Sequence, residues 1–197
     1  MKFIVEHLEP ECDEWSLLEY RNIASKVGPE NLILSGLDKD LIKKLDVDAQ
    51  LSSTGVLELC KTNAFGLDFN KVLLCDPAST VPLSPQDAAN YDALLFGGIL
   101  GDDPPRDRTK ELRDLGFSTR HLGPVQMTTD TACMAAHRVF HDQIPLEDLK
   151  IVDRPVIRLG KKEEVEMPFR YLLGESGPIL PLGMMDLLRR SNEMSLN

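Results

Sequence analysis

The residue types best suited to chemistry lie in one stretch, ALLFGGILGDDPPRDRT, at residues 93–109. A short apolar run there stops at Gly97 and Gly98, and Gly101 follows before two acids, two prolines and Arg-Asp-Arg. In α/β proteins, a buried strand that ends in a glycine-rich loop is a common place to hold a small ligand. Glycine lets main-chain amides approach a ligand where a Cβ atom would collide with it. The stretch therefore suggests a cradle for a nucleotide-like ligand.

The spacing of these glycines leaves a second interpretation equally open, namely a tight strand-to-helix turn that holds no ligand. The pattern is not a Rossmann fingerprint, because GGxxG lies in the middle of the chain without a convincing acid on a following strand. It is not a P-loop, because no Gly-Lys-Ser or Gly-Lys-Thr follows it. The glycines alone therefore do not decide between a ligand site and a turn.

A second candidate segment is RHLGPVQMTTD at residues 120–130. A predicted strand ends there, Gly123-Pro124 turns the chain, and Thr128 begins a helix whose first amides and positive dipole end are free for a ligand. Ordinary helix capping explains this segment better when it is taken by itself. Together with the glycine stretch, it predicts one crevice at the carboxyl edge of a sheet.

Two further segments offer carboxylates as general bases. Glu166 precedes Met, Pro, Phe, Arg and Tyr, which would desolvate a base beside a ligand ring, although a surface turn into an edge strand explains the segment better when it is taken by itself. Glu6 and His7 lie at the carboxyl end of the first predicted strand and so face the same rim; the alternative is a solvated acidic face with Trp15 buried beneath it.

His137 and His141 are four apart on a helix but have no third ligand in the sequence pattern, so a solvated face is predicted and no metal site.

The elements that must position these groups alternate between strands and helices. Strands are predicted at residues 3–5, 31–35, 72–75, 93–96 and 118–122, and helices at 14–27, 39–45, 107–115 and 128–142, with a short helix opening at Ser84-Pro85. Such alternation predicts an α/β fold with a mostly parallel sheet and helices on both faces. Residues 51–66 have no clear period. After Pro145 the pattern changes to extended segments at 151–152, 156–159 and 169–172, and then to a short helix at 184–190.

Composition bounds the class of protein. The chain has 197 residues, of which 42% are hydrophobic and 27% charged, so one domain over residues 1–190 with a frayed tail at 191–197 is predicted. The N-terminal apolar stretch is too short for a signal peptide, and no stretch approaches a transmembrane span. The four scattered cysteines include no CxxC and are expected to be reduced thiols in a cytoplasmic protein.

The net charge of −10 argues against a protein that depends mainly on phosphate contacts. It favours a basic peptide or a cationic ligand, because opposite charges steer encounter.

Four segments together carry a family resemblance: EHLEP with EWSLLEY, FGGILGDDPPRDRTKEL, LGPVQMTTDTA, and EMPFRYLL, in this order. They resemble the SPOUT-type methyltransferases of fungi and archaea whose characterised eukaryotic member is a protein arginine methyltransferase of the ribosome. The resemblance extends over residues 1–188 and is weakest between residues 39 and 66. It implies a SPOUT-like parallel sheet whose C-terminal part forms a trefoil knot, which periodicity alone would not suggest because knots are rare.

The resemblance also implies a cofactor, S-adenosylmethionine, bound among the knot loops. The residues that it places around the cofactor, with the main chain of Leu122 and Met127 facing the adenine edge, are Pro77, Ala78, Phe96, Gly97, Gly98, Ile99, Leu100, Gly101, Leu122, Gly123, Gln126, Met127 and Thr128. The implied reaction is methyl transfer to an arginine nitrogen of a basic small-subunit ribosomal protein. A carboxylate must then orient the guanidinium and accept its proton, and Glu166 is the first candidate, followed by Glu6 and Asp102.

Two rival functions stay open at this point. SPOUT proteins usually methylate RNA, but that work calls for a basic groove or an added RNA-binding domain, and neither is visible in the sequence. A second rival is a non-catalytic S-adenosylmethionine-binding factor for ribosome assembly, against which the glycine loop and the acidic rim speak weakly. A protein substrate needs open access, so a monomer without DNA or membrane partners is expected.

Overall fold

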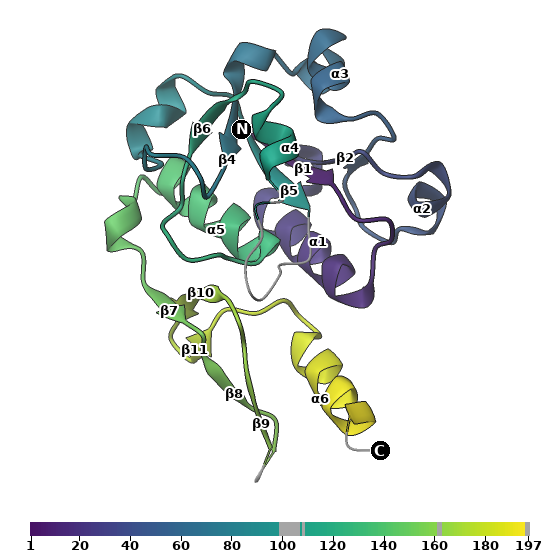
Figure 1. The fold of residues 1–197 in the computed structure, drawn as a ribbon, viewed down its shortest axis with the longest axis vertical. Coiled ribbons are helices and arrows are strands. Elements are labelled where there is room, and N and C mark those ends of the chain that lie inside the picture. Colours follow the sequence, from purple (N-terminus) through teal and green to yellow (C-terminus); the bar gives the residue numbers. More distant parts are fainter. Residues whose placement is uncertain (99–106, 108, 161–162, 196–197) are drawn as a thin grey trace.

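The computed structural model describes residues 1–98, 107, 109–160 and 163–195. For residues 193–195 it describes the backbone alone. A six-stranded parallel sheet dominates the fold, in the order β3-β2-β1-β5-β4-β6 (Figure 1). Its strands are β1 (Lys2–His7), β2 (Leu32–Ser35), β3 (Gln50–Leu51), β4 (Val72–Cys75), β5 (Ala93–Gly98) and β6 (Ser118–Arg120). The predicted mostly parallel sheet is confirmed.

Helices cover both faces of this sheet, because successive side chains of a strand point to opposite sides. Phe3 and Val5 of β1 face α1 (Glu14–Val27) and α5 (Thr129–Phe140), whereas Ile4 faces α3 (Val56–Lys61) and α4 (Lys110–Arg113). Between the strands lie α2 (Lys39–Lys44) and the short 3-10 helices η1 (Pro29–Asn31), η2 (Ala64–Gly66), η3 (Phe69–Lys71) and η4 (Pro85–Ala89).

Helix α1 begins and ends where the sequence predicts. Asp13 caps it by accepting a hydrogen bond from the main-chain N–H of Ser16 at 2.8 Å. Gly28 ends it with φ of +87°, a conformation that L side chains rarely adopt.

Two predicted elements are clearly shorter than expected, and one segment without a clear period contains a helix. The helix predicted over 107–115 is α4, only Lys110–Arg113, and the strand predicted to residue 122 ends at Arg120 because His121 pairs instead with Val81 and Leu83. The aperiodic segment 51–66 contains α3, which stops where Asn63 and Phe65 adopt left-handed φ values of 52° and 54°.

The chain after α5 forms a smaller layer at one edge of the sheet (Figure 1). After η5 (Leu146–Asp148), β7 (Ile151–Asp153), β10 (Arg170–Gly174) and β11 (Gly177–Pro178) form an antiparallel sheet, and β8 (Val156–Arg158) pairs with β9 (Glu164–Glu166). Helix α6 (Met184–Ser195) packs beside them through Met184 and Leu188, in a separate apolar cluster that Trp15 and Leu18 of α1 join.

Helix α6 extends beyond the predicted end at residue 190, so residues 191–195 of the predicted frayed tail are helical. A bond from Arg190 to Glu14 ties this helix to α1. The single domain and the trefoil knot stay predictions. No helix among the described residues is both long and apolar enough to span a bilayer, and the four cysteines there are free thiols.

Candidate active site

A cavity of about 380 Å³ opens at the carboxyl ends of β4 and β5, beside the chain that leaves β6. Three of its walls come from the ends of neighbouring parallel strands, which is where open α/β sheets hold ligands. A fourth comes from the first turn of α5. Its lining consists of Cys75, Asp76, Pro77, Ala78, Phe96, Gly97, Asp107, Thr109, Leu122, Gly123, Pro124, Val125, Gln126, Met127, Thr129 and Ala132.

The segment after β6 is held firmly against its neighbours. The main-chain N–H of Asp76 donates to the carbonyl of Arg120 at 2.8 Å, which joins the loops after β4 and β6. His121 accepts a hydrogen bond through Nδ1 from the N–H of Gly123 at 3.0 Å. Gly123 has φ of +112°, and a Cβ there would meet the Arg170 guanidinium at 2.9 Å, so this turn requires glycine.

The smaller C-terminal sheet forms the outer support of the same loop. The N–H of Arg170 donates to the carbonyl of Gln126 at 2.9 Å, and Met127 forms an isolated parallel bridge with Arg170. The Arg170 guanidinium in turn binds both oxygens of Asp153, at 2.5 and 2.8 Å. Two layers of the fold therefore fix one wall of the cavity.

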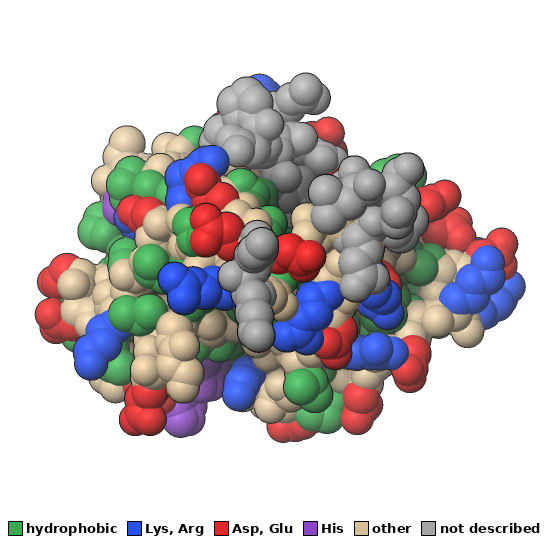
Figure 2. Space-filling view, turned by 90° about the horizontal axis from the view of Figure 1, so that it is seen from below, with side chains coloured by type: hydrophobic (Ala, Val, Ile, Leu, Met, Phe, Trp, Pro, Cys, Tyr) green, Lys and Arg blue, Asp and Glu red, His purple; other side chains and the backbone are tan. Residues whose placement is uncertain are grey.

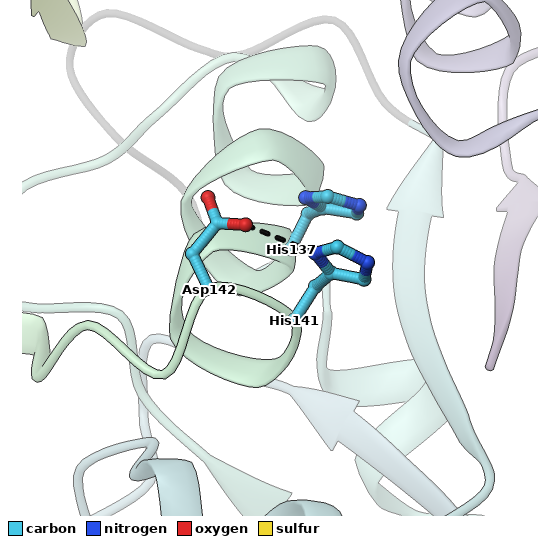
Figure 3. Close-up of side chains that lie close together, drawn as sticks. All are labelled: His137, His141 and Asp142. Carbon is cyan, nitrogen blue, oxygen red and sulfur yellow. Dashed lines mark hydrogen bonds and ion pairs between the residues drawn. The ribbon is translucent and has the colours of Figure 1, made fainter.

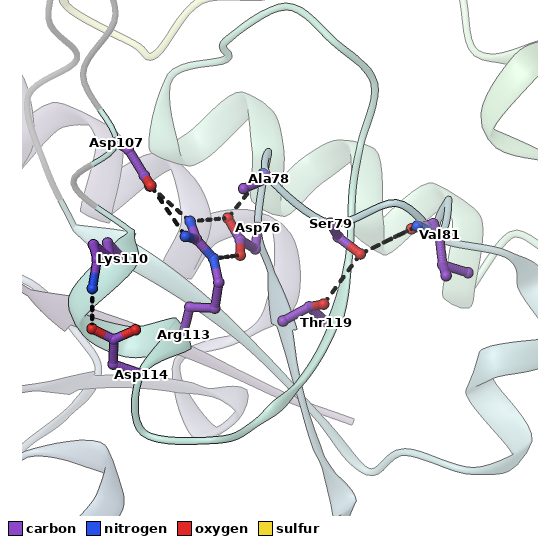
Figure 4. Close-up of polar contacts among 9 residues, drawn as sticks. All are labelled: Asp76, Ala78, Ser79, Val81, Asp107, Lys110, Arg113, Asp114 and Thr119. Carbon is purple, nitrogen blue, oxygen red and sulfur yellow. Dashed lines mark hydrogen bonds and ion pairs between the residues drawn. The ribbon is translucent and has the colours of Figure 1, made fainter.

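The guanidinium of Arg113 lies between two carboxylates of the cavity lining, Asp76 and Asp107 (Figure 4). It binds both oxygens of Asp76, at 2.5 and 3.1 Å, and both oxygens of Asp107, at 2.7 and 3.1 Å. Asp76 is buried and also accepts from the N–H of Ala78 at 3.0 Å. These bonds lower the pKa of Asp107 below its usual value and raise that of Arg113. The guanidinium thus clamps the turn after β4 to the chain that enters α4.

The structure brings together most of the predicted cofactor residues that it describes. Those lining the cavity are Pro77, Ala78, Phe96, Gly97, Leu122, Gly123, Gln126 and Met127. Two others do not line it: Thr128 is buried, where its hydroxyl donates to Asp130 and lies 2.7 Å from the Thr131 hydroxyl, and Gly98 packs against Tyr20. Ile99, Leu100 and Gly101 lie outside the described residues.

Neither of the two predicted catalytic carboxylates that the structure describes lines this cavity. Glu6 is turned to the α3 side, where it accepts hydrogen bonds from the Ser35 hydroxyl and from the Val56 N–H at 3.0 Å; burial raises its pKa. Glu166, on β9, is half exposed and binds the Arg154 guanidinium at 2.5 Å. Asp102 lies outside the described residues. Their catalytic roles stay predictions.

The predicted cofactor residues did not include eight of the lining residues, three of which (Pro124, Val125 and Thr129) lie in the candidate segment 120–130; the eight are Cys75, Asp76, Asp107, Thr109, Pro124, Val125, Thr129 and Ala132. A signal for Asp76 existed, because an acid directly after a buried strand and before a proline stands at the ligand edge of a parallel sheet. Arg113 carried no such signal, because its two partners are 37 and 6 positions away in the chain.

Gly98 is needed for packing rather than for the shape of the cavity. A Cβ there would meet the Tyr20 hydroxyl at 2.6 Å and Val5 Cγ1 at 2.8 Å. We therefore expect Gly98→Val to lower the free energy of unfolding by about 2 kcal/mol through overpacking. Chemical denaturation measures this, with Gly97→Ala as the matched control, because a Cβ at Gly97 meets only ordinary contacts at 3.6 and 3.9 Å. Equal stability of the two variants would contradict this account of Gly98.

The histidine pair has a neighbour that the sequence pattern did not reveal (Figure 3). His137, His141 and Asp142 place possible metal-ligand atoms within 4.8 Å of one another, and His141 Nδ1 lies 2.9 Å from an Asp142 oxygen. They stand at the far end of α5, where His137 is about 8 Å and His141 about 14 Å along the helix from the lining residue Ala132, and none of the three lines the cavity. The cluster is therefore separate from the candidate active site.

Comparison with known proteins identifies the family. Residues 2–195 match a family model described as protein arginine N-methyltransferase SFM1-like. Protein arginine N-methyltransferase SFM1 of Saccharomyces cerevisiae (strain ATCC 204508 / S288c) is 44% identical over 210 residues, which cover 100% of this chain and 98% of the yeast protein.

Solved structures of the yeast arginine methyltransferase SFM1 agree in fold. The complex with SAH has 43% sequence identity and a TM-score of 0.84, covering 94% of this chain and 93% of the yeast chain. The complex with SAM has 41% identity and a TM-score of 0.86, covering 96% and 90%. The parallel sheet, the cavity at its carboxyl edge and these full-length matches together show that the chain belongs to the SFM1-like family of protein arginine N-methyltransferases.

Proposed function

We propose that this protein transfers a methyl group from S-adenosylmethionine to an arginine nitrogen of a small-subunit ribosomal protein. The observation that supports it most is the cavity at the carboxyl edge of the sheet, in a chain similar over its whole length to an arginine methyltransferase whose structures hold SAM and SAH. The ribosomal substrate comes from the sequence resemblance alone. We further propose that the protein acts as a monomer in the cytoplasm.

The cavity suits the proposed cofactor in size and lining. Its volume of about 380 Å³ falls in the range of small-molecule sites. Phe96, Leu122 and Met127 offer apolar surface for an adenine ring, and Gly97 and Gly123 leave main-chain groups uncovered by a side chain. When bound, the cofactor supplies a methyl group on a cationic sulfur.

The residues of this chain have two tasks in such a reaction. The cavity loops must hold the donor so that the acceptor nitrogen, methyl carbon and sulfur are nearly collinear. A carboxylate must orient the guanidinium and take a proton from it, because the pKa of a free guanidinium exceeds about 12. We propose Glu166 for this second task, with Glu6 and Asp102 as the other candidates.

Glu166→Gln is expected to keep the affinity for S-adenosylmethionine and to lose most of the turnover. Removing a general base typically lowers a rate by about 100-fold or more. Single-turnover methylation and calorimetric binding measure the two effects separately. Glu164→Gln is the matched control, because this exposed carboxylate lies on the same strand. Turnover of the Glu166 variant equal to that of the control would remove Glu166 from the mechanism.

A labelled methyl donor tests the proposed function. We expect the purified protein to label the guanidinium of a basic small-subunit ribosomal protein and to leave naked ribosomal RNA unlabelled. The charge supports this expectation: the chain carries 32 acidic against 22 basic residues, and both kinds are interspersed on the face in Figure 2. RNA binding depends on neutralising phosphates with Lys and Arg.

The other outcomes of this experiment are equally definite. Label in the RNA alone would identify an RNA methyltransferase and contradict the proposal. Label in neither, with the cofactor bound, would favour a binding-only assembly factor. Fragment mass analysis of the labelled protein would identify the modified arginine.

A further inference from the structure

Two buried carboxylates, Glu19 of α1 and Asp130 of α5, lie together behind the wall of the cavity. Glu19 accepts hydrogen bonds from the Trp15 indole N–H at 2.6 Å and from the N–H of Thr129 at 3.2 Å. Asp130 accepts from the Asn22 amide at 2.7 Å and from the Thr128 hydroxyl at 2.7 Å. Only 5% of Glu19 and 1% of Asp130 is exposed. All of these donors are uncharged, so the pair has hydrogen bonds but no counter-charge from them.

Two other carboxylates of the described structure that are buried to this degree are neutralised. Asp76 is bound by Arg113, and Asp87 is bound by Arg120 at 2.8 Å. Neither Glu19 nor Asp130 forms an ion pair with a described cation. Burying an ionised carboxylate without an opposite charge is costly. In its ionised form the pair would therefore be stabilised by a positive charge brought by a ligand.

Near this pair lies a third buried polar group, the hydroxyl of Tyr171. The Tyr171 hydroxyl is buried and has no hydrogen-bond partner among the described residues. Its pKa is raised by burial and then by the charges of Glu19 and Asp130, so it lies in their field. Burial likewise raises the pKa of both carboxyls, and for Glu19 the charge of Asp130 adds to this effect.

The pair is directly connected to the cavity. Thr129 lines the cavity, donates its N–H to Glu19, and places its hydroxyl 3.5 Å from the carbonyl of Gly97, which also lines the cavity. Asp130 is the next residue in the chain. A charged ligand in this part of the cavity would interact with the pair through protein rather than through water. The interaction between charges is several times stronger through protein than through water.

We propose that Glu19 and Asp130 make the cavity prefer the cationic methyl donor over its neutral product. This inference rests on the proposed function. In the transfer, the S–CH3 bond breaks with its electron pair going to sulfur, the guanidinium nitrogen bonds the methyl carbon, and the proton of that nitrogen passes to the carboxylate proposed for this task, Glu166. The sulfonium becomes a neutral thioether, so the attraction to the pair is lost and the product is released. The pair sets cofactor specificity through its charge rather than by touching the reacting atoms.

Calorimetric titration with S-adenosylmethionine and with S-adenosylhomocysteine tests this inference. The proteins are the wild type, Asp130→Asn, Glu19→Gln and the double variant, with Glu58→Gln as a control that removes an exposed charge from α3. We expect the double variant to bind the sulfonium about tenfold more weakly, the fold-change for about 1.4 kcal/mol of lost attraction, while its thioether affinity stays within about twofold. The control should match the wild type for both ligands.

Parallel losses of both affinities, or unchanged affinities in the double variant, would overturn the inference while leaving the proposed function intact. Failure of the wild type to bind S-adenosylmethionine at all would instead overturn the proposed function. The two results are thus distinguishable. Thermal melting of each variant checks that it is folded.

A measurement on the wild type keeps the test independent of any variant. A bound cation favours ionisation of the pair, so binding of the sulfonium should release protons and binding of the thioether should not; titration in buffers of different ionisation enthalpy measures this. The other titratable groups around the pair are His7, Tyr20, Cys133 and Tyr171. Burial keeps them neutral by lowering the pKa of His7 and raising the others. Equal proton release by the two ligands would contradict the inference.

Discussion

Arg113→Gln is expected to lower the free energy of unfolding by about 3 kcal/mol, because it leaves the carboxylate of Asp76 buried without its cation. The Asp76 side chain is 1% exposed and the Arg113 side chain 30% exposed. Water therefore has little access to the Asp76 carboxylate and cannot solvate it when the guanidinium is removed. Urea denaturation measures the change. The control Arg190→Gln breaks a pair between half-exposed side chains and should cost about 0.5 kcal/mol or less.

The same variant should also weaken cofactor binding in the protein that stays folded. Arg113 joins the cavity residues Asp76 and Asp107, so without it the two walls lose their fixed separation. We expect the affinity for S-adenosylmethionine to fall by at least about tenfold, a cost of about 1.4 kcal/mol. An Arg113 variant as stable as the Arg190 variant, with unchanged affinity, would contradict the clamp.

Acid should act on the same clamp with a definite sign. The pKa of Asp107 is lowered mainly by its hydrogen bonds to Arg113, so its contribution to stability is present above the ordinary aspartate pKa. That contribution is lost as the pH falls through the lowered pKa. Arg113→Gln should therefore show a smaller loss of stability than the wild type below about pH 4.

Ala132→Trp is expected to abolish measurable cofactor binding while the protein stays folded. Ala132 lies in the first turns of α5 and lines the cavity, so a large side chain there extends into the space that the donor would occupy. Methyl transfer should fall to the background rate for the same reason. Calorimetry and labelled methyl transfer measure these two losses.

Ala132→Ser is the matched control for this substitution, because it changes the same position with little added volume. It should bind S-adenosylmethionine within about threefold of the wild type, a difference of about 0.6 kcal/mol. Normal affinity in the tryptophan variant would show that the donor binds elsewhere. Thermal melting separates this result from simple unfolding.

Local patterns in the sequence were sufficient to predict the framework of the site. The apolar run before Gly97 predicted β5, the run at residues 72–75 predicted β4, and Asp13 predicted the start of α1. Each of these depends on neighbours in the chain. The glycine turn at Gly123 was predicted for the same reason, since its conformation is fixed by local backbone sterics.

Pairing between distant residues was beyond local patterns. Thr129 binds Glu19 across 110 positions of the chain, and Arg113 binds Asp76 across 37. Glu6 was predicted at the rim, but it points to the same side of β1 as Ile4, toward α3, because side chains alternate along a strand. Only the packed fold decides which of several carboxylates receives a cation and which is left without one.

The most direct test of the account is a crystal structure of the protein with S-adenosylmethionine. We expect ligand density in the cavity between Phe96, Leu122 and Met127, with the sulfonium on the side of Thr129 and the pair behind it. Density for the ligand at another place, or an empty cavity at saturating ligand in a protein that still methylates arginine, would contradict the account.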